Sequence, residues 1–222
     1  MADLCKQSDV KLIASFFEDP ADIPLWISQA TSFEALGADM LELNFSSPSA
    51  ARVFARSFDS ASHIISEVKK NTSIPVGLKL SPTLEPLEAF AAACQDAGLD
   101  FISAHNAPAG IVIDVENEAP FGAPSIGGYV MGRSFLPYSL GRVVRIRKAS
   151  HVPVIGVGGI YEAQDALQYI LGGCPLVGIG SAMYFKGPQI LETLTEDITN
   201  WMKINVGVAD FVWEFAQPAL LN

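Results

Sequence analysis

Residues 153–188, PVIGVGGIYEAQDALQYILGGCPLVGIGSAMYFKGP, decide the fold class of this chain. An apolar strand at 153–157 runs into Gly158-Gly159, and a helix with an apolar stripe follows it. A second apolar strand at 176–179 then runs into Gly180-Ser181. Strands separated by a helix-length segment pair in parallel, so this stretch predicts two successive βα units.

The glycines that end these two strands have two interpretations. Glycine exposes backbone N–H groups and adds no side-chain bulk, so Gly158-Gly159 and Gly180-Ser181 together are suited to cradle a phosphate. In (β/α)8 barrels the phosphate site is typically built after strands seven and eight, and this pair lies near the C-terminus. Alternatively, the glycines only shape tight βα turns. The run lacks the Gly-x-Gly-x-x-Gly spacing of dinucleotide-binding folds.

Strand and helix patterns alternate along the rest of the chain. Alternating βα units indicate a parallel sheet with helices outside it. Segment 107–135 interrupts the alternation with glycines, prolines and a candidate hairpin at 111–115. The expected strands are 11–17, 38–45, 74–80, 101–105, 153–157 and 176–179, and the expected helices are 24–36, 57–70, 84–97, 136–148, about 163–170 and 189–202.

Six βα units leave two fold classes. A closed (β/α)8 barrel has eight strands and usually about 250 residues. The sheet is therefore either open and doubly wound, or of the TIM-barrel type with its first two units missing from this chain. The glycine pair favours the α/β barrel, as a single domain over 1–222. The missing strands then come from a partner chain, or the chain is a fragment.

Composition narrows the function classes. The formal net charge of −10 and the absence of a basic patch argue against nucleic-acid binding. The apolar runs are strand-sized and the N-terminus lacks an apolar signal core, so no membrane segment or signal peptide is expected. Three cysteines without metal-ligand spacing fit a reduced, cytoplasmic protein that holds no metal.

Three polar side chains share one face of the predicted sheet. Strand alternation sets Leu41 and Leu43 on one face, and Glu42 and Asn44 on the other. Lys79 occupies the corresponding inward face of the next strand. A buried lysine needs an anionic partner. Either Glu42 and Lys79 form a structural pair, or Lys79 is held for an anionic cofactor or intermediate.

Polar residues also follow the strand ends, where barrels keep their active sites. Ser47 is either a catalytic base or a turn cap, and serine is a poor base without a proton relay. His105 and Asn106 end a later strand, and a lone histidine is more often a hydrogen-bonded structural residue.

Several motifs together resemble the dihydroorotate dehydrogenase family, which includes the FMN domain of dihydropyrimidine dehydrogenase. They are LELNFSSPS, VGLKLSP, SAHN, PVIGVGGI, GIGSAM and a trailing GP, in family order, and the likeness covers about residues 10–202. The resemblance implies an FMN-binding (β/α)8 barrel that oxidises a dihydropyrimidine or reduces a pyrimidine. The serine at position 47 resembles the membrane-associated class, whereas the cytosolic class carries cysteine.

The resemblance also implies roles for individual residues. Ser47 is the base, and hydride passes to flavin N5. Lys79 lies at the pyrimidine end of the flavin and stabilises negative charge there. Asn44 and Asn106 bind the substrate ring and the cofactor, and insert 107–135 partly covers the site. The ribityl phosphate end is held by Gly127, Gly128, Gly158, Gly159, Gly180 and Ser181.

The chain departs from the family pattern in ways that leave the substrate open. Pro48 is followed by Ser49 where the family usually has asparagine, and the insert carries Glu116 and Glu118. The leading hypothesis is an FMN-dependent oxidoreductase acting on a small molecule, as a homodimer or with a partner chain that completes the barrel. The alternatives are a catalytically silent fragment or subunit, and a non-flavin, phosphate-binding barrel enzyme.

Overall fold

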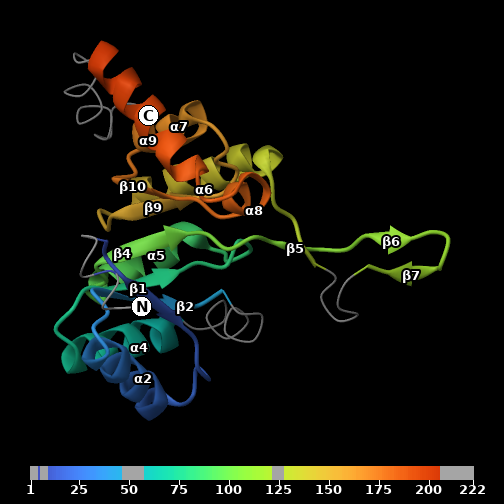
Figure 1. Cartoon of the computed structure of the whole chain (residues 1–222). Coiled ribbons are helices and arrows are strands. Elements are labelled where there is room, and N and C mark those ends of the chain that lie inside the picture. The colour runs from blue at the N-terminus through green and yellow to red at the C-terminus, as the bar shows by residue number, and fades with distance from the viewer. Residues whose placement is uncertain (1–4, 6–9, 47–57, 122–127, 206–222) are drawn as a thin grey trace.

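The computed structural model describes Cys5 and residues 10–46, 58–121 and 128–205 (Figure 1). Its centre is one sheet of six parallel strands in the order β1-β2-β3-β4-β9-β10. The strands are β1 (Ile13–Phe16), β2 (Met40–Asn44), β3 (Val76–Lys79), β4 (Phe101–Ala104), β9 (Val154–Val157) and β10 (Leu176–Gly178).

The strand order decides between the two expected fold classes. In a doubly wound sheet the strand order reverses at a switch point. Here the six strands of the sheet instead lie side by side in the order in which they occur along the chain. This single winding is that of a barrel, and the sheet curls into a six-stranded half-barrel of the TIM type. The expected α/β barrel class is confirmed.

Helices cover the outer face of the sheet in chain order. Each main helix packs against the next one, from α2 through α4, α5, α6 and α7 to α9 (Figure 1). The helices are α2 (Ile23–Ala35), α4 (Phe58–Asn71), α5 (Leu87–Asp96), the 3-10 turn η1 (Arg133–Phe135), α6 (Leu136–Ala149), α7 (Ala163–Leu171), α8 (Ser181–Lys186) and α9 (Ile190–Ile204).

The core lies between the sheet and these helices, as the sequence alternation predicts. Leu41 and Leu43 of β2 are fully buried on the outer face, and Leu78 of β3 lies beside them. Ile64 and Ile65 of α4 are also fully buried in this cluster. The apolar face of the sheet is thus used for packing, which leaves the opposite face for polar side chains.

One helix begins later than predicted, and another short helix was not predicted. The helix expected at 84–97 begins at Leu87, because the residue before a proline is disfavoured in helical conformation and Pro86 occupies the cap position. The short helix α8 (Ser181–Lys186) was not expected, because six residues are too few to show a helical period.

Segment 107–132, here called the arm, leaves the body of the molecule between β4 and α6 (Figure 1). It contains β5 (Ala109–Gly110) paired with β8 (Gly128–Tyr129), and β6 (Ile113–Asp114) paired with β7 (Ala119–Pro120). The hairpin expected at 111–115 is therefore longer and turns after Asp114. The Asp114 carboxylate accepts the N–H groups of Glu116 and Asn117, which stabilises this turn.

Candidate functional site

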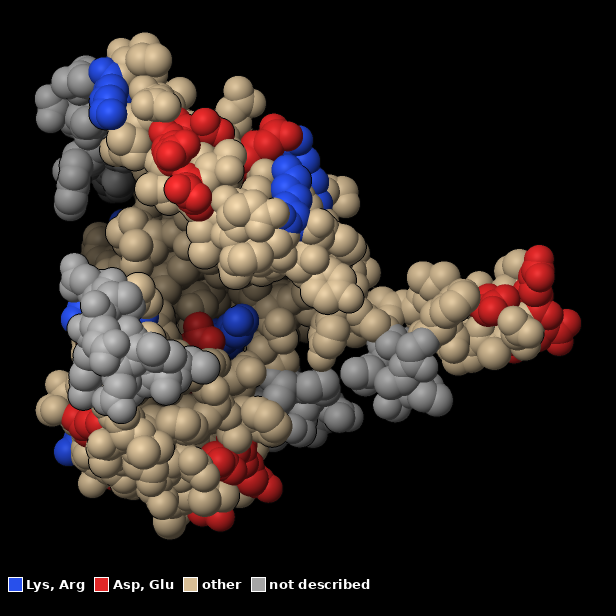
Figure 2. All heavy atoms as spheres, viewed as in Figure 1, with Lys and Arg blue, Asp and Glu red and all other residues tan. Residues whose placement is uncertain are grey.

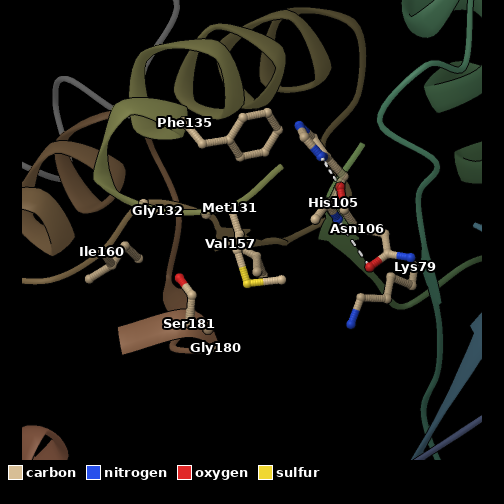
Figure 3. A pocket seen from close by; sticks show the side chains of 14 residues that line it. Lys79, His105, Asn106, Met131, Gly132, Phe135, Val157, Ile160, Gly180 and Ser181 are labelled. Atoms are coloured by element: carbon tan, nitrogen blue, oxygen red, sulfur yellow. Dashed lines mark hydrogen bonds between the residues drawn. The ribbon is translucent and has the colours of Figure 1, made fainter. Parts of the chain in front are cut away.

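A cavity of about 200 Å³ opens at the carboxyl ends of β3, β4, β9 and β10. Figure 2 shows that the molecule is hollowed between its two groups of helices. Figure 3 shows Lys79 and Asn106 on one side of the cavity and Gly180 and Ser181 across from them. The cavity therefore joins the lysine predicted from strand alternation to the glycines predicted from the βα turns.

The two glycine turns lie together at the cavity, but glycine has a different role in each of them. Gly159 has φ +73°, and a Cβ there would lie 2.5 Å from the backbone nitrogen of Leu136, so the turn itself requires glycine. Gly158 has φ +124° and is also in the glycine-favouring region. A Cβ on Gly180, which has φ −116°, would meet no atom within 4 Å. Packing does not require glycine at 180, and its missing side chain leaves room in the cavity.

Hydroxyl groups hold the glycine end in place. The Tyr169 hydroxyl donates to the carbonyl of Gly158 at 2.7 Å, and the Ser139 hydroxyl donates to the carbonyl of Val157. The Tyr161 hydroxyl donates to Ser181 Oγ at 3.0 Å. The loop backbone is thus tied to α6 and α7, which gives the open end of the cavity a defined shape.

Lys79 at the end of β3 lies beside a buried carboxylate. Its Nζ is 3.8 Å from Glu42 Oε1, and its side chain remains 30% exposed. Glu42 also accepts hydrogen bonds from the hydroxyls of Ser15, at 2.7 Å, and Ser103. The two hydroxyls supply the hydrogen bonds of the Glu42 carboxylate, so this carboxylate does not need the Lys79 ammonium as a hydrogen-bond donor. Lys79 therefore pairs with Glu42 by charge and also lines the cavity (Figure 3).

Asn106 borders the cavity next to Lys79 (Figure 3). The side-chain Oδ1 of Asn106 accepts the backbone N–H of Ala107 at 3.0 Å, and the backbone N–H of Asn106 donates to the carbonyl of Leu80 at 3.0 Å. Because Oδ1 is occupied, the side-chain NH2 group of Asn106 is the part that can donate to a ligand.

His105 also lines the cavity but is positioned as a structural residue. It is 2% exposed, and Phe135 and Tyr138 contact its ring edge-on at 5.5 and 5.6 Å. Burial lowers the pKa of His105 to about 4, and the nearby Arg142 contributes in the same direction. The imidazole is therefore neutral near pH 7, with Nδ1 bonded to the carbonyl of Asn106 at 2.8 Å.

Two of the expected site residues, Asn44 and Gly128, do not line this cavity, and two others cannot be placed. Asn44 ends β2, and its Oδ1 accepts the N–H and the hydroxyl of Ser46 at 3.1 and 2.5 Å. Gly128 lies in β8 on the arm, paired with Gly110. Ser47 and Gly127 lie outside the described residues.

Sequence reasoning did not single out Met131, Phe135 or Ile160 as cavity residues. All three line the cavity, and Met131 reaches its middle from the base of the arm (Figure 3). Met131 lies on the arm beyond the predicted hairpin, where no strand or helix period indicated which side chain turns toward the site.

The described part of the chain offers no metal centre or reactive thiol at this site. No group of three or more His, Cys, Asp or Glu side chains there could hold a metal ion. Cys94 and Cys174 are buried, and burial raises the pKa of both thiols, to about 12 for Cys174. No described helix is long and apolar enough to cross a membrane.

Comparison with known proteins agrees with the motifs. The family model described as dihydroorotate dehydrogenase matches residues 26–202. The chain belongs to the dihydroorotate dehydrogenase family. The matched range contains Lys79, Asn106 and both glycine turns, so the whole described cavity lies within the part that the family shares.

Several curated members of the family are similar to this chain, and each is named dihydroorotate dehydrogenase B (NAD(+)), catalytic subunit. The protein of Desulforamulus reducens is 34% identical over 180 residues, which are 80% of this chain and 58% of that protein. The protein of Geotalea uraniireducens is 36% identical over 173 residues (77% and 56%). The protein of Methanocaldococcus jannaschii is 31% identical over 204 residues (90% and 65%). The chain thus matches 56 to 65% of the length of these three relatives.

Proposed function

We propose that this chain is an FMN-dependent oxidoreductase that transfers hydride between a dihydropyrimidine-like substrate and flavin N5. The observation that carries the proposal is one cavity with a lysine at one side and an open glycine turn at the other. A flavin mononucleotide needs both features, because its ring gains negative charge on reduction and its other end is a phosphate. Membership of the dihydroorotate dehydrogenase family supports the same chemistry.

The residues present fit the cofactor. Gly158, Gly159, Gly180 and Ser181 would hold the phosphate, and the space beside Gly180 is the feature that turn geometry alone does not explain. Lys79 would lie at the pyrimidine end of the ring. FMN supplies the hydride acceptor when it is bound.

The chain's own side chains would do the rest of the chemistry. Lys79 would stabilise negative charge at the ring, and Glu42 keeps its ammonium group at the side of the cavity. The amide of Asn106 donates to the substrate ring, and Asn44 is the second amide that the family resemblance assigns to this task. Ser47 takes a proton from one ring carbon of the substrate while hydride leaves the next carbon.

We further propose that the chain works as a homodimer or with a partner chain that covers the open sides of the sheet. In the described residues β1 and β10 each pair on one side only. Ile13 in β1 is 37% exposed and Leu176 in β10 is 58% exposed. Uncovered strand edges with apolar side chains favour association. The relatives are named as subunits, which supports an assembly. The buried free thiols of Cys94 and Cys174 support a reducing, cytoplasmic compartment.

The test is the visible absorption spectrum of the purified chain after incubation with FMN and gel filtration. Retained flavin near one per chain is expected. At a hundredfold excess over Kd, bound FMN should raise stability by about 2.7 kcal/mol, or roughly 5 to 10 °C in Tm. Dihydroorotate and other dihydropyrimidines are then screened with a dye as electron acceptor. If the chain neither retains FMN nor gains thermal stability, the proposal is wrong.

A catalytically silent subunit of such a barrel is the second candidate, favoured by the same open edges at β1 and β10. It predicts self-association without turnover. Size-exclusion chromatography separates the two: a flavin-loaded, active monomer contradicts the silent subunit, whereas a flavin-free oligomer supports it.

A further inference from the structure

Tyr161 lies just behind the glycine end of the site cavity. It follows Ile160, which lines the cavity, but Tyr161 itself is not one of the lining residues. The Tyr161 hydroxyl donates to Ser181 Oγ at 3.0 Å, from a residue 20 positions away in the sequence. Ser181 does line the cavity, across from Lys79 (Figure 3). Tyr161 therefore reaches the site through Ser181.

Tyr161 is held at both its backbone and its ring. Its N–H donates to Asp165 Oδ2 at 3.0 Å, and its carbonyl accepts a hydrogen bond from Lys186 Nζ at 3.2 Å. The same ammonium group lies over the Tyr161 ring, 5.9 Å from the ring centroid, where a cation is attracted to the ring face. Because the residue is anchored in this way, its hydroxyl has a defined position beside Ser181.

The direction of the bond between the two hydroxyls decides what Ser181 can do. A phenol is a better hydrogen-bond donor than an aliphatic alcohol, so Tyr161 supplies the hydrogen and Ser181 accepts it. A serine hydroxyl can accept and donate at the same time, so Ser181 keeps its own hydrogen for another group. Within the part of the chain that the structure describes, no oxygen accepts this hydrogen. It is left to a ligand in the cavity.

A directed hydroxyl matters at this end of the cavity because the charge lies at the other. Lys79 is the only lysine or arginine among the described residues that line the cavity, and it lies across from Ser181 (Figure 3). A phosphate at the Ser181 end is therefore bound by hydrogen bonds rather than by an ion pair. Phosphate oxygens are strong acceptors, and a hydrogen bond to a charged oxygen is about twice as strong as a neutral one.

We propose that Tyr161 is a positioning residue for a phosphate monoester, because it fixes the Ser181 hydroxyl as a donor to the phosphate group. This rests on the proposed function, in which the phosphate is that of FMN, and deepens it by assigning the preference for the phosphorylated flavin over riboflavin. Without the Tyr161 hydroxyl, the Ser181 hydroxyl is free to rotate, and part of its hydrogen bond to the phosphate is lost.

The test compares two ligands that differ only in the phosphate. Tyr161→Phe keeps the ring under Lys186 and removes the hydroxyl alone. Quenching of flavin fluorescence gives the Kd of FMN and of riboflavin. FMN should bind about threefold to tenfold more weakly to the variant, whereas the Kd of riboflavin should stay within about twofold.

A double-mutant cycle tests whether Tyr161 acts through Ser181. Ser181→Ala should weaken FMN binding at least as much as Tyr161→Phe does. Once Ser181 is alanine, Tyr161→Phe should change the Kd by less than about twofold, because the two hydroxyls act as one unit. Tyr184→Phe is the matched control: Tyr184 lies on the same helix as Ser181, is 85% exposed and does not line the cavity, so neither Kd should change.

Two outcomes overturn the proposal. If Tyr161→Phe weakens FMN and riboflavin equally, the hydroxyl only supports the fold of the loop. If it still weakens FMN when Ser181 is alanine, it does not act through Ser181.

Ribose 5-phosphate, titrated by calorimetry, separates this inference from the flavin function. Binding of ribose 5-phosphate that depends on Tyr161, with no flavin retained, would contradict the oxidoreductase and support the phosphate site. FMN that binds equally well to Tyr161→Phe would contradict the role of Tyr161 and leave the oxidoreductase standing. A chain that binds neither FMN nor ribose 5-phosphate would overturn both.

Discussion

Lys79 Nζ lies 3.8 Å from Glu42 Oε1, from neighbouring strands β3 and β2. The separation is long for a charged hydrogen bond, which is usually 2.7 to 2.9 Å between heavy atoms. Glu42 is instead bonded to the hydroxyls of Ser15 and Ser103. The carboxylate thus holds the ammonium group by charge without occupying its donors, and those donors remain available to a ligand in the cavity.

Lys79→Met should weaken FMN binding by about tenfold to a hundredfold, the worth of a charge-assisted hydrogen bond. The Kd is measured by quenching of flavin fluorescence. Lys70→Met is the control, because Lys70 is exposed on α4 and pairs with Glu67 on the same helix, away from the cavity. Equal Kd values for the Lys79 variant and the unmodified chain would contradict the assignment of Lys79.

Glu42→Gln and Lys79→Met should shift the reduction potential of the bound flavin in opposite directions. Removing the carboxylate leaves the charge of Lys79 less compensated, so the anionic reduced ring is stabilised and the potential rises. Lys79→Met should lower the potential. A titration against a reference dye measures both, and shifts of the same sign would contradict the pairing.

Gly180→Ala and Gly159→Ala should separate cofactor binding from folding. A methyl group on Gly180 meets no protein atom within 4 Å, so stability should stay within about 0.5 kcal/mol while FMN affinity falls about tenfold. A methyl group on Gly159 overlaps the backbone of Leu136, so the free energy of unfolding should fall by about 1 to 3 kcal/mol. Urea unfolding and the FMN Kd are measured on both. Destabilisation by Gly180→Ala would show that packing requires this glycine.

Ser47→Ala should slow the oxidation of the substrate by about 10² to 10⁴-fold and leave FMN bound, because a general base contributes to the proton transfer and not to cofactor binding. Single-turnover reduction of the flavin, followed by absorbance, is the measurement. Ser49→Ala, two residues along the same segment, should retain full activity. Full activity of Ser47→Ala would remove Ser47 as the base.

His105 should make the protein less stable as the pH falls from about 6.5 to about 4. Burial lowers the pKa of His105 to about 4, whereas the unfolded chain takes up the proton near 6.5. The unfolded state binds more protons within this window, so about 3 kcal/mol of stability is lost across it, and no more below it from this group.

Urea unfolding at pH 7 and pH 4.5 measures the loss due to His105. His105→Gln should remove most of this pH dependence, and His151→Gln, at an exposed position, should not. Unchanged pH dependence in the His105 variant would contradict the assigned cause.

Glu85 contributes to stability in a lower pH window. Hydrogen bonding to Arg145 lowers the pKa of Glu85 to about 2, so its contribution is lost between about pH 4.5 and 2.

Local periodicity predicted most of the elements, because the burial of a helix stripe or a strand face depends on residues close in sequence. Glu42 and Lys79 were placed on one face from alternation alone, and the structure pairs them. The helix α8 was not predicted because it is too short to show a period, and α5 was predicted but begins later, after Pro86. The turn η1 and the two-residue strands β5, β7 and β8 are also too short for a periodic pattern.

The sequence by itself determined the order of the elements, the inward position of Lys79 and the two glycine turns, because strand alternation and the conformational freedom of glycine are local properties. Only the tertiary structure decided the strand order that makes the sheet a half-barrel and the opposition of Lys79 to Gly180. It also decided that Met131 enters the cavity from the arm. These relationships join residues far apart in the chain, and they depend on how the helices and strands pack together, which no local pattern encodes.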